Sequence, residues 1–241
     1  MTAPVFLCSD LDGDRVVLSG PEGRHAATVR RLRVGEQADL TDGVGQVVSG
    51  VVSAVSPESV TFSVLSRRSV PRPSPALTVV QALPKGDRGE LAVETMTEAG
   101  VDTIVPWAAE HCVAVWRGEK ADRGAERWRS TAREAAKQSR RAWLPDIADP
   151  ASTAAVAKLV PAAASAIVLE ADAALRLHQL ALPDEGDILL IVGPEGGISP
   201  AERAALGDAG AIEARLGPTV LRTSTAGAVA AATLLSRANR W

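Results

Sequence analysis

Three prolines lie within five residues of this chain, at Pro71, Pro73 and Pro75. Proline fixes its own φ and lacks a backbone N–H, so such a segment can continue neither a helix nor a central strand. The residue pattern also changes here, from short strand-like runs punctuated by Gly, Asp and Pro to strand and helix patterns that alternate. We therefore predict two domains, residues 1–70 and 76–241, joined by a stiff connector.

The first domain is predicted to be a small β-barrel with one helix around residues 25–31. Its β-branched or alternating runs are residues 16–18, 37–40, 47–55 and 59–65. The segment Asp42–Gly45 (DGVG) fits a hairpin turn between two of these strands. It is not a dinucleotide-binding fingerprint, because the third glycine is missing and a strand pattern follows.

The second domain is predicted to be an α/β domain with a parallel sheet. Strands are expected at residues 76–83, 101–106, 166–170 and 188–192, and helices at 86–99 and 122–142. The short continuous apolar runs suit strands that are buried on both faces. Leu91, Ala92, Thr95, Met96 and Ala99 share one face of the first helix, whereas Trp128, Ala132, Ala135 and Ser139 form the inner stripe of the second.

Composition narrows the class of protein. The chain has 241 residues, of which 46% are hydrophobic, which is enough for a sizeable core. No apolar run reaches the roughly 18 residues of a membrane helix, and no basic region precedes an apolar core at the N-terminus, so we expect a cytoplasmic protein with no membrane association. Cys8 and Cys112 are then expected to be reduced thiols. The three histidines form no ligand spacing, so no metal is expected.

Two stretches are locally basic although the formal net charge is -3. Residues 21–35 carry four arginines against Glu22, and residues 123–141 carry a similar excess of cations. Such stretches can follow nucleic-acid phosphates, or they can be ordinary solvated helix faces. Charge alone leaves both interpretations open.

The most informative segment is residues 188–202 (ILLIVGPEGGISPAE). A buried strand pattern runs into a glycine-rich loop, and a helix follows with Ser199 as N-cap, Pro200 at the first position and Glu202 three residues after the cap. Ligands of α/β sheets bind beyond the carboxyl ends of strands, where glycines let backbone approach them. No Gly-Lys-Ser/Thr follows, so this loop is not a P-loop and a phosphate is not the expected ligand. A glycine-rich turn without a ligand remains the alternative.

A second glycine loop follows at residues 216–227 (LGPTVLRTSTAG) and leads into a helix at 223–237. That helix is apolar on nearly every side, so we expect it to be buried in its own domain or against a partner subunit. Two such loops in one domain favour a ligand over an empty turn.

These motifs resemble the RsmE-type 16S ribosomal RNA uridine-N3 methyltransferases of the SPOUT class. The resemblance rests on residues 193–197 (GPEGG), 216–223 (LGPTVLRT), 85–88 (KGDR), 134–141 (EAAKQSRR) and 25–33 (HAATVRRLR), and it spans nearly the whole chain. It implies a PUA-like β-barrel followed by an α/β methyltransferase domain with a trefoil knot. It further implies a homodimer that binds S-adenosylmethionine and modifies one uridine of 16S ribosomal RNA in the small ribosomal subunit.

The resemblance also implies site residues. For the cofactor these are Leu169, Val192, Gly193, Pro194, Glu195, Gly196, Gly197, Leu216, Gly217, Pro218, Leu221, Arg222, Thr223 and Ala226. For RNA they are His25, Arg30, Arg31, Arg33, Arg88, Lys137, Arg140 and Arg141. Each of these cations can equally be a solvated charge. The family often has Arg at the position of Thr219 and Glu at that of Ser224, so the roles of those side chains do not carry over.

Arg222 and Glu195 are the catalytic candidates. Uridine N3 bears a proton, so a group must remove it or stabilise the resulting anion. Arg222 is the candidate for stabilising a uridine oxyanion, and Glu195 is a possible base that can instead cap its own loop. The alternatives are an RNA-binding ribosome assembly factor without activity and a SPOUT enzyme that acts on another RNA or on a ribose hydroxyl. A dehydrogenase is disfavoured by the missing fingerprint.

Overall fold

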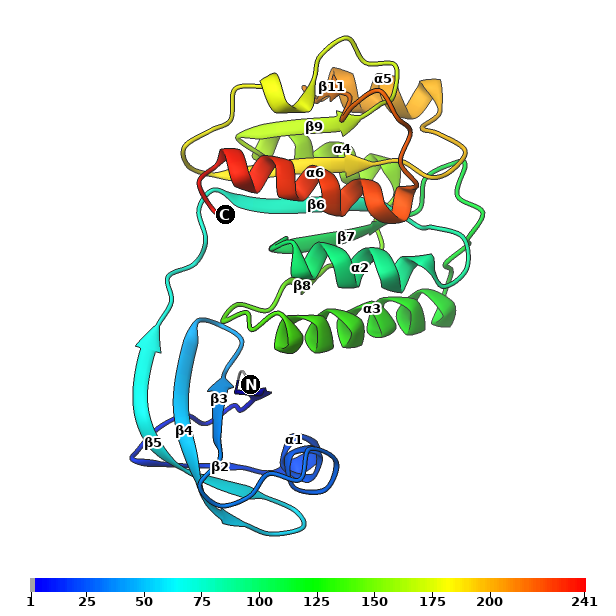
Figure 1. Ribbon diagram of the computed structural model, residues 1–241. Helices are drawn as coiled ribbons and strands as arrows, with labels where there is room; N and C mark the ends of the chain where they lie inside the picture. The colour runs from blue at the N-terminus through cyan, green and yellow to red at the C-terminus, as the bar shows by residue number, and fades with distance from the viewer. Residues whose placement is uncertain (1–2) are drawn as a thin grey trace. The chain divides into compact units, whose positions relative to one another are not determined.

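The computed structural model describes residues 3–241. The chain forms two compact units (Figure 1). The first contains the residues up to Arg72 together with Ala136–Leu144, and the second contains Pro73–Ala135 together with Pro145–Trp241. A short piece from the middle of the sequence therefore belongs to the N-terminal unit.

The first unit is built on a five-stranded sheet with the order β1-β3-β4-β5-β2. The strands are β1 (Val5–Leu7), β2 (Arg15–Leu18), β3 (Gln37–Thr41), β4 (Gln46–Val55) and β5 (Val60–Ser69). β1 and β3 are parallel, and the other neighbouring pairs are antiparallel. Phe6, Leu40 and Phe62 are at most 1% exposed and lie in its core. The four strands predicted for this region are confirmed.

The hairpin at Asp42–Gly45 is also confirmed, since β3 and β4 are antiparallel neighbours. The Asp42 side chain accepts hydrogen bonds from the backbone N–H groups of Val44 (2.8 Å) and Gln46 (3.0 Å), as is usual for Asp in turns. The helix expected around residues 25–31 is wrong in its bounds. Helix α1 (Gly20–Arg24) starts earlier and continues into one π-type turn, η1 (His25–Val29), and Arg31 ends it with a φ of 54°.

The segment 136–144 completes the first unit through ion pairs and backbone hydrogen bonds. Lys137 contacts Glu22 at 2.8 Å, and Arg140 contacts Asp39 at 2.8 Å. The Leu144 N–H donates to the carbonyl of Gly43 at 2.9 Å. Helix α3 (Glu119–Gln138) therefore ends before the predicted residue 142, because Arg140 has a φ of 59° and the chain turns toward strand β3.

The second unit contains a six-stranded sheet with the order β11-β9-β10-β6-β7-β8, and all its neighbouring strands are parallel. The strands are β6 (Ala76–Ala82), β7 (Thr103–Trp107), β8 (Asp146–Ile147), β9 (Ser165–Leu169), β10 (Asp187–Val192) and β11 (Ile212–Ala214). The prediction of an α/β domain with a parallel sheet is confirmed.

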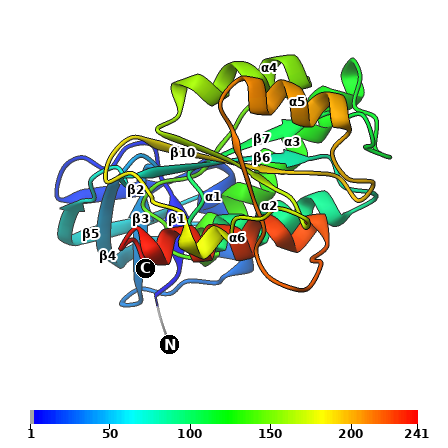
Figure 2. The ribbon, with the colours of Figure 1, turned by 90° about the horizontal axis from the view of Figure 1, so that it is seen from above.

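Helices cover both faces of this sheet (Figure 2). α4 (Thr153–Leu159) and α5 (Pro200–Asp208) lie on one face, with α2 (Arg88–Glu98) and α6 (Thr223–Arg237) on the other. Short 3-10 turns, η2 (Val160–Ala162) and η3 (Leu177–Gln179), complete the connections. α2 buries Ala92 and Met96 as predicted, but Leu91 is 45% exposed.

Helix α6 is buried on one side only. Ala230, Ala231 and Leu234 are fully buried against α2 and the sheet, whereas Val229 is 44% exposed. The apolar pattern therefore correctly indicated a packed helix. One side of α6 is buried within its own unit, and apolar side chains on the other side remain exposed to solvent. No helix within residues 3–241 combines the length and the apolar character needed to cross a membrane.

Candidate functional site

The first part of the site is the loop between β10 and α5. Gly193 follows the buried strand, and a Cβ there would come within 2.6 Å of the Ile198 side chain, which is itself only 7% exposed. Glycine is therefore required for this close turn. Ser199 and Glu202 form the predicted capping box, with Pro200 at the first helical position. The strand, loop and helix inferred for residues 188–202 are confirmed.

The second part is the loop between β11 and α6, which is joined to the first loop and to strand β6 by hydrogen bonds of Thr223. The Thr223 hydroxyl donates to the carbonyl of Gly193 at 2.6 Å. It also accepts from the side-chain amide of Gln81, at the end of β6, at 3.0 Å. One threonine thus connects two loops that are 30 residues apart in the sequence and ties both to the central sheet.

A cavity of about 400 Å³ lies between these loops and the end of β9. It is lined by Leu169, Glu170, Ala171, Val192, Gly193, Pro194, Glu195, Gly197, Ile198, Arg215, Leu216, Gly217, Thr219, Val220, Leu221, Arg222, Thr223 and Ala226. Figure 1 shows that the arrowheads of β9 and β10 point toward the end of the sheet where these loops lie. This is the usual position of a ligand site in a parallel α/β sheet.

The structure brings most of the candidate cofactor residues together around this one cavity. Gly196 and Pro218 belong to the same loops but are not among the lining residues. Thr219 and Val220 also line the cavity and belong to the 216–221 backbone segment expected to hold the cofactor, whereas four further lining residues were not predicted from the sequence: Glu170, Ala171, Ile198 and Arg215. Glu170 and Ala171 directly follow Leu169, the last residue of β9. Because ligands bind beyond the carboxyl ends of parallel strands, the predicted end of this strand could have indicated both residues.

Glu170 contributes a half-buried carboxyl group to the cavity wall. Partial burial raises the pKa of its carboxyl above the usual value. The nearby Arg203 opposes this shift, while Glu213 and Asp172 add to it. Arg203 is itself paired with Glu213 at 2.6 Å.

The two catalytic candidates both line the cavity and are both exposed. The Glu195 carboxylate accepts a hydrogen bond from the backbone N–H of Lys85 at 3.2 Å, so it contacts a neighbouring loop and does not cap its own. The Arg222 guanidinium makes no ion pair with any residue from 3 to 241, and its backbone caps the start of α6. Arg222 is thus available to a negatively charged group in the cavity.

His111, in the loop after β7, contacts the backbone of the first loop. The sequence did not indicate a role for this residue. Its Nδ1 lies 3.2 Å from the carbonyl oxygen of Gly196 and 3.0 Å from that of Gly197. Carbonyls only accept hydrogen bonds, so Nδ1 must carry a hydrogen. Because 85 residues separate His111 from Gly196, no local pattern could have indicated this contact.

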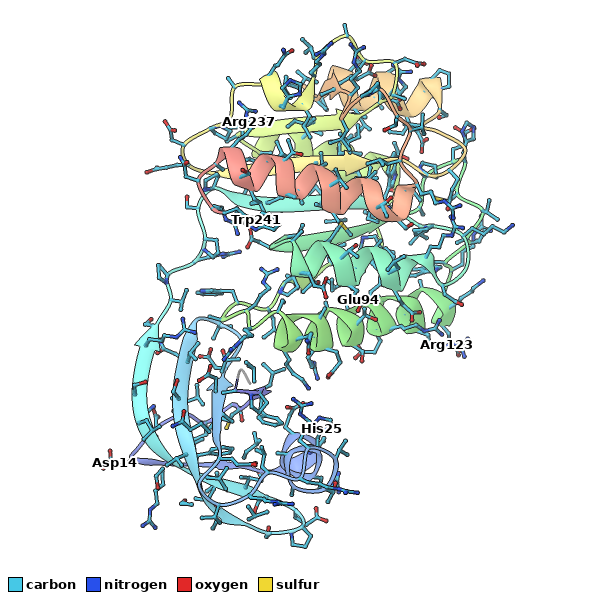
Figure 3. The ribbon with its side chains drawn as sticks, viewed as in Figure 1. Asp14, His25, Glu94, Arg123, Arg237 and Trp241 are labelled. Carbon is cyan, nitrogen blue, oxygen red and sulfur yellow. The ribbon has the colours of Figure 1, made fainter. Side chains whose placement is uncertain are left out.

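The candidate RNA-binding residues fall into three groups. Arg30, Arg31, Arg33 and Arg88 are exposed. His25, labelled in Figure 3, is half-buried. Its ring meets that of Phe6 edge-on at a centroid distance of 6.3 Å. Lys137 and Arg140 form the ion pairs described above, and Arg141 lies in the same segment, half-buried. The exposed arginines are the best placed to reach phosphates, and the RNA role of the whole set stays a prediction.

Comparison with known proteins agrees with this geometry. Residues 71–235 match the profile of an RNA methyltransferase domain, and residues 18–65 match that of an RNA methyltransferase PUA domain. The fold and the loop site thus define an RNA methyltransferase with an attached PUA domain.

Relatives and solved structures define the family more narrowly. The ribosomal RNA small subunit methyltransferase E of Mycobacterium bovis is 48% identical over 247 aligned residues, which cover 100% of this chain and 94% of the relative. A methyltransferase structure from Legionella pneumophila, in complex with the cofactor SAM, has a TM-score of 0.87 at 27% identity and covers 98% of both chains. A Neisseria gonorrhoeae structure at 24% identity, also with a TM-score of 0.87 and 98% coverage of both chains, shares the fold. The chain belongs to the ribosomal RNA small subunit methyltransferase E family.

Proposed function

We propose that this protein transfers the methyl group of S-adenosylmethionine to N3 of one uridine in 16S ribosomal RNA. The observation that carries the proposal is the cavity of about 400 Å³ between the two glycine loops. The 48% identity to a relative named as a ribosomal RNA small subunit methyltransferase supports the substrate class. The Legionella structure, solved with SAM at 27% identity, supports the cofactor.

The residues around the cavity fit such a cofactor. A volume of about 400 Å³ is within the range of small-molecule sites. Leu169, Val192 and Leu216 offer apolar surface to an adenine ring, and the backbone of residues 193–197 and 216–221 offers donors and acceptors to its polar edges. At Gly217 no atom of a residue beyond its two chain neighbours lies within 4 Å of where a Cβ would be, so the backbone is open to close approach by a ligand.

The chain's own groups would orient the substrate and stabilise its charge. When bound, the cofactor supplies an activated methyl group. The loops would align the uridine and exclude water, which can contribute several kcal/mol to lowering the barrier. Arg222 would stabilise the negative charge on a uridine oxygen after N3 loses its proton. Glu195 stays a candidate for the base that removes the N3 proton. To do so, its carboxylate would have to give up or share the hydrogen bond that it accepts from the Lys85 N–H.

The decisive experiment incubates the protein with labelled cofactor and small ribosomal subunits that lack this modification, and then maps the labelled nucleoside. Label in 3-methyluridine of the 16S RNA is expected. Label in a ribose or in another RNA would identify a different SPOUT activity. Failure of the protein to release heat when titrated with the cofactor would indicate an RNA-binding factor without activity.

A matched pair of glycine variants tests the cofactor site. Gly217→Leu is expected to fill the cavity and abolish calorimetric binding of S-adenosylmethionine. Gly207→Leu, on the exposed side of α5, is the control, since no atom outside the neighbouring helix backbone lies within 4 Å of an added Cβ and Gly207 does not line the cavity. Equal binding by both variants would contradict this assignment.

We further propose, as the family resemblance implies, a cytoplasmic homodimer with a trefoil knot in the second unit and RNA binding by the first. The dimer is supported by exposed apolar side chains on and near α6, with Val220 84% and Val229 44% exposed. Sedimentation equilibrium at micromolar concentration would test the dimer, and a monomer there would exclude it.

A further inference from the structure

A second cavity of about 400 Å³ lies in the same unit, outside the site described above. Its walls come from the segment between β6 and α2, from the loop after β7 and from the first half of α3. Trp116 and Trp128 supply its aromatic surface. Nothing in the proposed cofactor site uses these residues.

The aromatic surface is held by an unusual helix position. Gly124 lies within α3, where glycine costs about 1 kcal/mol relative to alanine. A Cβ at Gly124 would lie 2.6 Å from atoms of the Trp116 ring, so the ring packs directly against the helix backbone. Trp128, only 2% exposed, meets Trp116 edge-on at a centroid distance of 5.2 Å. Trp116 is therefore a fixed, half-buried ring at the cavity wall.

The cavity also carries positive charge. Lys120, Arg123 and Arg127 line it from α3, against one acid, Glu90. Arg127 is paired with Glu90 at 3.3 Å, whereas Lys120 and Arg123 make no ion pair with any residue from 3 to 241. Figure 3 shows Arg123 at the N-terminal end of α3. A fixed aromatic ring beside two uncompensated cations matches the chemistry of a nucleotide, which presents a flat base and a phosphate.

The two cavities are neighbours. Pro84 and Gly86 line the second cavity. Between them, the backbone N–H of Lys85 donates to Glu195, which lines the first. One short segment thus separates them, and a ligand that occupies both must be extended, as a single RNA strand is.

We propose that this second cavity holds an unpaired nucleotide of the substrate RNA near the methylated uridine. Its base stacks on Trp116, and its phosphate contacts Lys120 and Arg123. Stacking of splayed bases on aromatic side chains is how proteins bind single-stranded RNA. This inference rests on the proposed function for its substrate, but it names a site of its own.

Two variants disrupt the ring in different ways. Trp116→Ala removes it, and Gly124→Ala displaces it while favouring the helix. Trp116→Phe keeps an aromatic face. Trp241→Ala is the matched control, because Trp241 is 70% exposed and lies at the opposite end of the unit from Arg123 (Figure 3). Thermal unfolding and cofactor calorimetry establish that each variant is folded and binds the methyl donor.

The readout is fluorescence anisotropy with labelled hexauridylate, with uridine monophosphate as competitor, together with kcat and KM on unmethylated subunits. Trp116→Ala and Gly124→Ala are expected to weaken hexauridylate binding roughly fivefold to hundredfold and to raise KM more than they lower kcat. Trp116→Phe and Trp241→Ala should stay near the parent protein.

The outcomes separate the two proposals. Unchanged hexauridylate affinity in folded Trp116→Ala overturns the nucleotide pocket, even if the parent protein methylates its substrate. A selective loss of affinity supports the pocket, even if the labelled nucleoside is not 3-methyluridine. Binding of uridine monophosphate more tightly than hexauridylate would overturn the assignment to an RNA strand.

Discussion

Thr223 links the two loops of the candidate cofactor cavity to each other and to the central sheet. Its hydroxyl donates to the Gly193 carbonyl and accepts from Gln81, so it serves both loops at once. A hydrogen bond contributes modestly to stability on average, but a buried group left without its partner costs more. Removing the Thr223 hydroxyl deprives both the Gly193 carbonyl and the Gln81 side-chain amide of this hydrogen-bond partner. The shape of the side chain is almost unchanged when valine replaces threonine.

Thr223→Val is therefore expected to lower the free energy of unfolding by roughly 1–3 kcal/mol and to weaken cofactor binding. Thr233→Val on the same helix is the control, since the Thr233 hydroxyl donates to the backbone carbonyl of Val229, one turn earlier, in a hydrogen bond that is exposed. Urea unfolding followed by circular dichroism gives the comparison. Equal midpoints for the two variants would show that the Thr223 link is not structural.

The side chain of Arg222 is predicted to act mainly in turnover, whereas its backbone belongs to the loop that lines the cofactor cavity. Arg222→Ala should leave the calorimetric Kd for S-adenosylmethionine within about threefold, while kcat falls by roughly 10²-fold or more, as for other groups that stabilise a developing charge. Arg15→Ala, an exposed arginine of the first unit, is the comparison. Normal turnover by Arg222→Ala would remove this residue from the mechanism.

At the scale of elements, the start of α5 is the best-defined feature of the site. The Glu202 carboxylate accepts from the N–H of Ser199 (3.1 Å), the N–H of Glu110 (2.9 Å) and the hydroxyl of Thr153 (2.7 Å). Burial alone would raise the pKa of Glu202, but these hydrogen bonds together bring it below the usual value. One carboxylate thus joins α5 to α4 and to the loop after β7.

This arrangement makes part of the stability depend on pH. The folded-state pKa of Glu202 is lowered, so its contribution is present above the unfolded value of about 4.3 and is lost as the pH falls through the folded value. Glu202→Gln should lower the free energy of unfolding at pH 7 by roughly 1–3 kcal/mol and flatten its decline below about pH 5. Urea titrations from pH 3 to 7, with exposed Glu185→Gln as control, measure this; parallel curves for all three proteins would contradict it.

Local signals explain which elements the sequence could predict. The boundary of α5 follows from Ser199, Pro200 and Glu202, which lie within four residues of one another and act on the same backbone groups. The end of α3 could not be predicted in the same way. Arg140 takes its left-handed conformation where it contacts Asp39, which is 101 residues earlier in the sequence.

The same distinction applies to the sites. The two glycine loops were visible because each is a continuous motif that follows a strand. His111 was not, because its contacts with Gly196 and Gly197 exist only after the sheet has formed. The pocket around Trp116 could not be predicted for a related reason. A glycine at position 124 is explained only by the packing of the Trp116 ring against it, which exists only in the folded protein.

For the whole molecule, the main prediction concerns salt. Each phosphate contact on single-stranded RNA contributes about -0.7 to the slope of log affinity against log salt, and about -0.9 on a duplex. Changing Arg30, Arg31 and Arg33 to Gln should therefore make this slope shallower by about 2–3. Filter binding to 16S RNA from 50 to 300 mM KCl gives the slopes.

The comparison for this variant is Arg15→Gln combined with Arg68→Gln, two exposed arginines on strands of the same unit. These changes remove two positive charges, against three in the test variant, and lie outside the 30–33 cluster; the slopes are therefore compared per charge removed. Equal slopes for the two variants would assign the effect to overall charge. A parent protein whose affinity ignores salt would exclude phosphate recognition by these arginines.

The inclusion of residues 136–144 in the first unit has a consequence for biosynthesis. Gly43 and Gly45 exchange backbone hydrogen bonds with Leu144 and Ala142, so the β3–β4 hairpin lacks these partners until residue 144 has been translated. At roughly 5–20 residues per second, the nascent N-terminal sheet waits several seconds after Arg72 is added. A chaperone that shields this exposed β3–β4 turn would act during that interval, and arrested chains that stop short of residue 144 should be the most sensitive to protease.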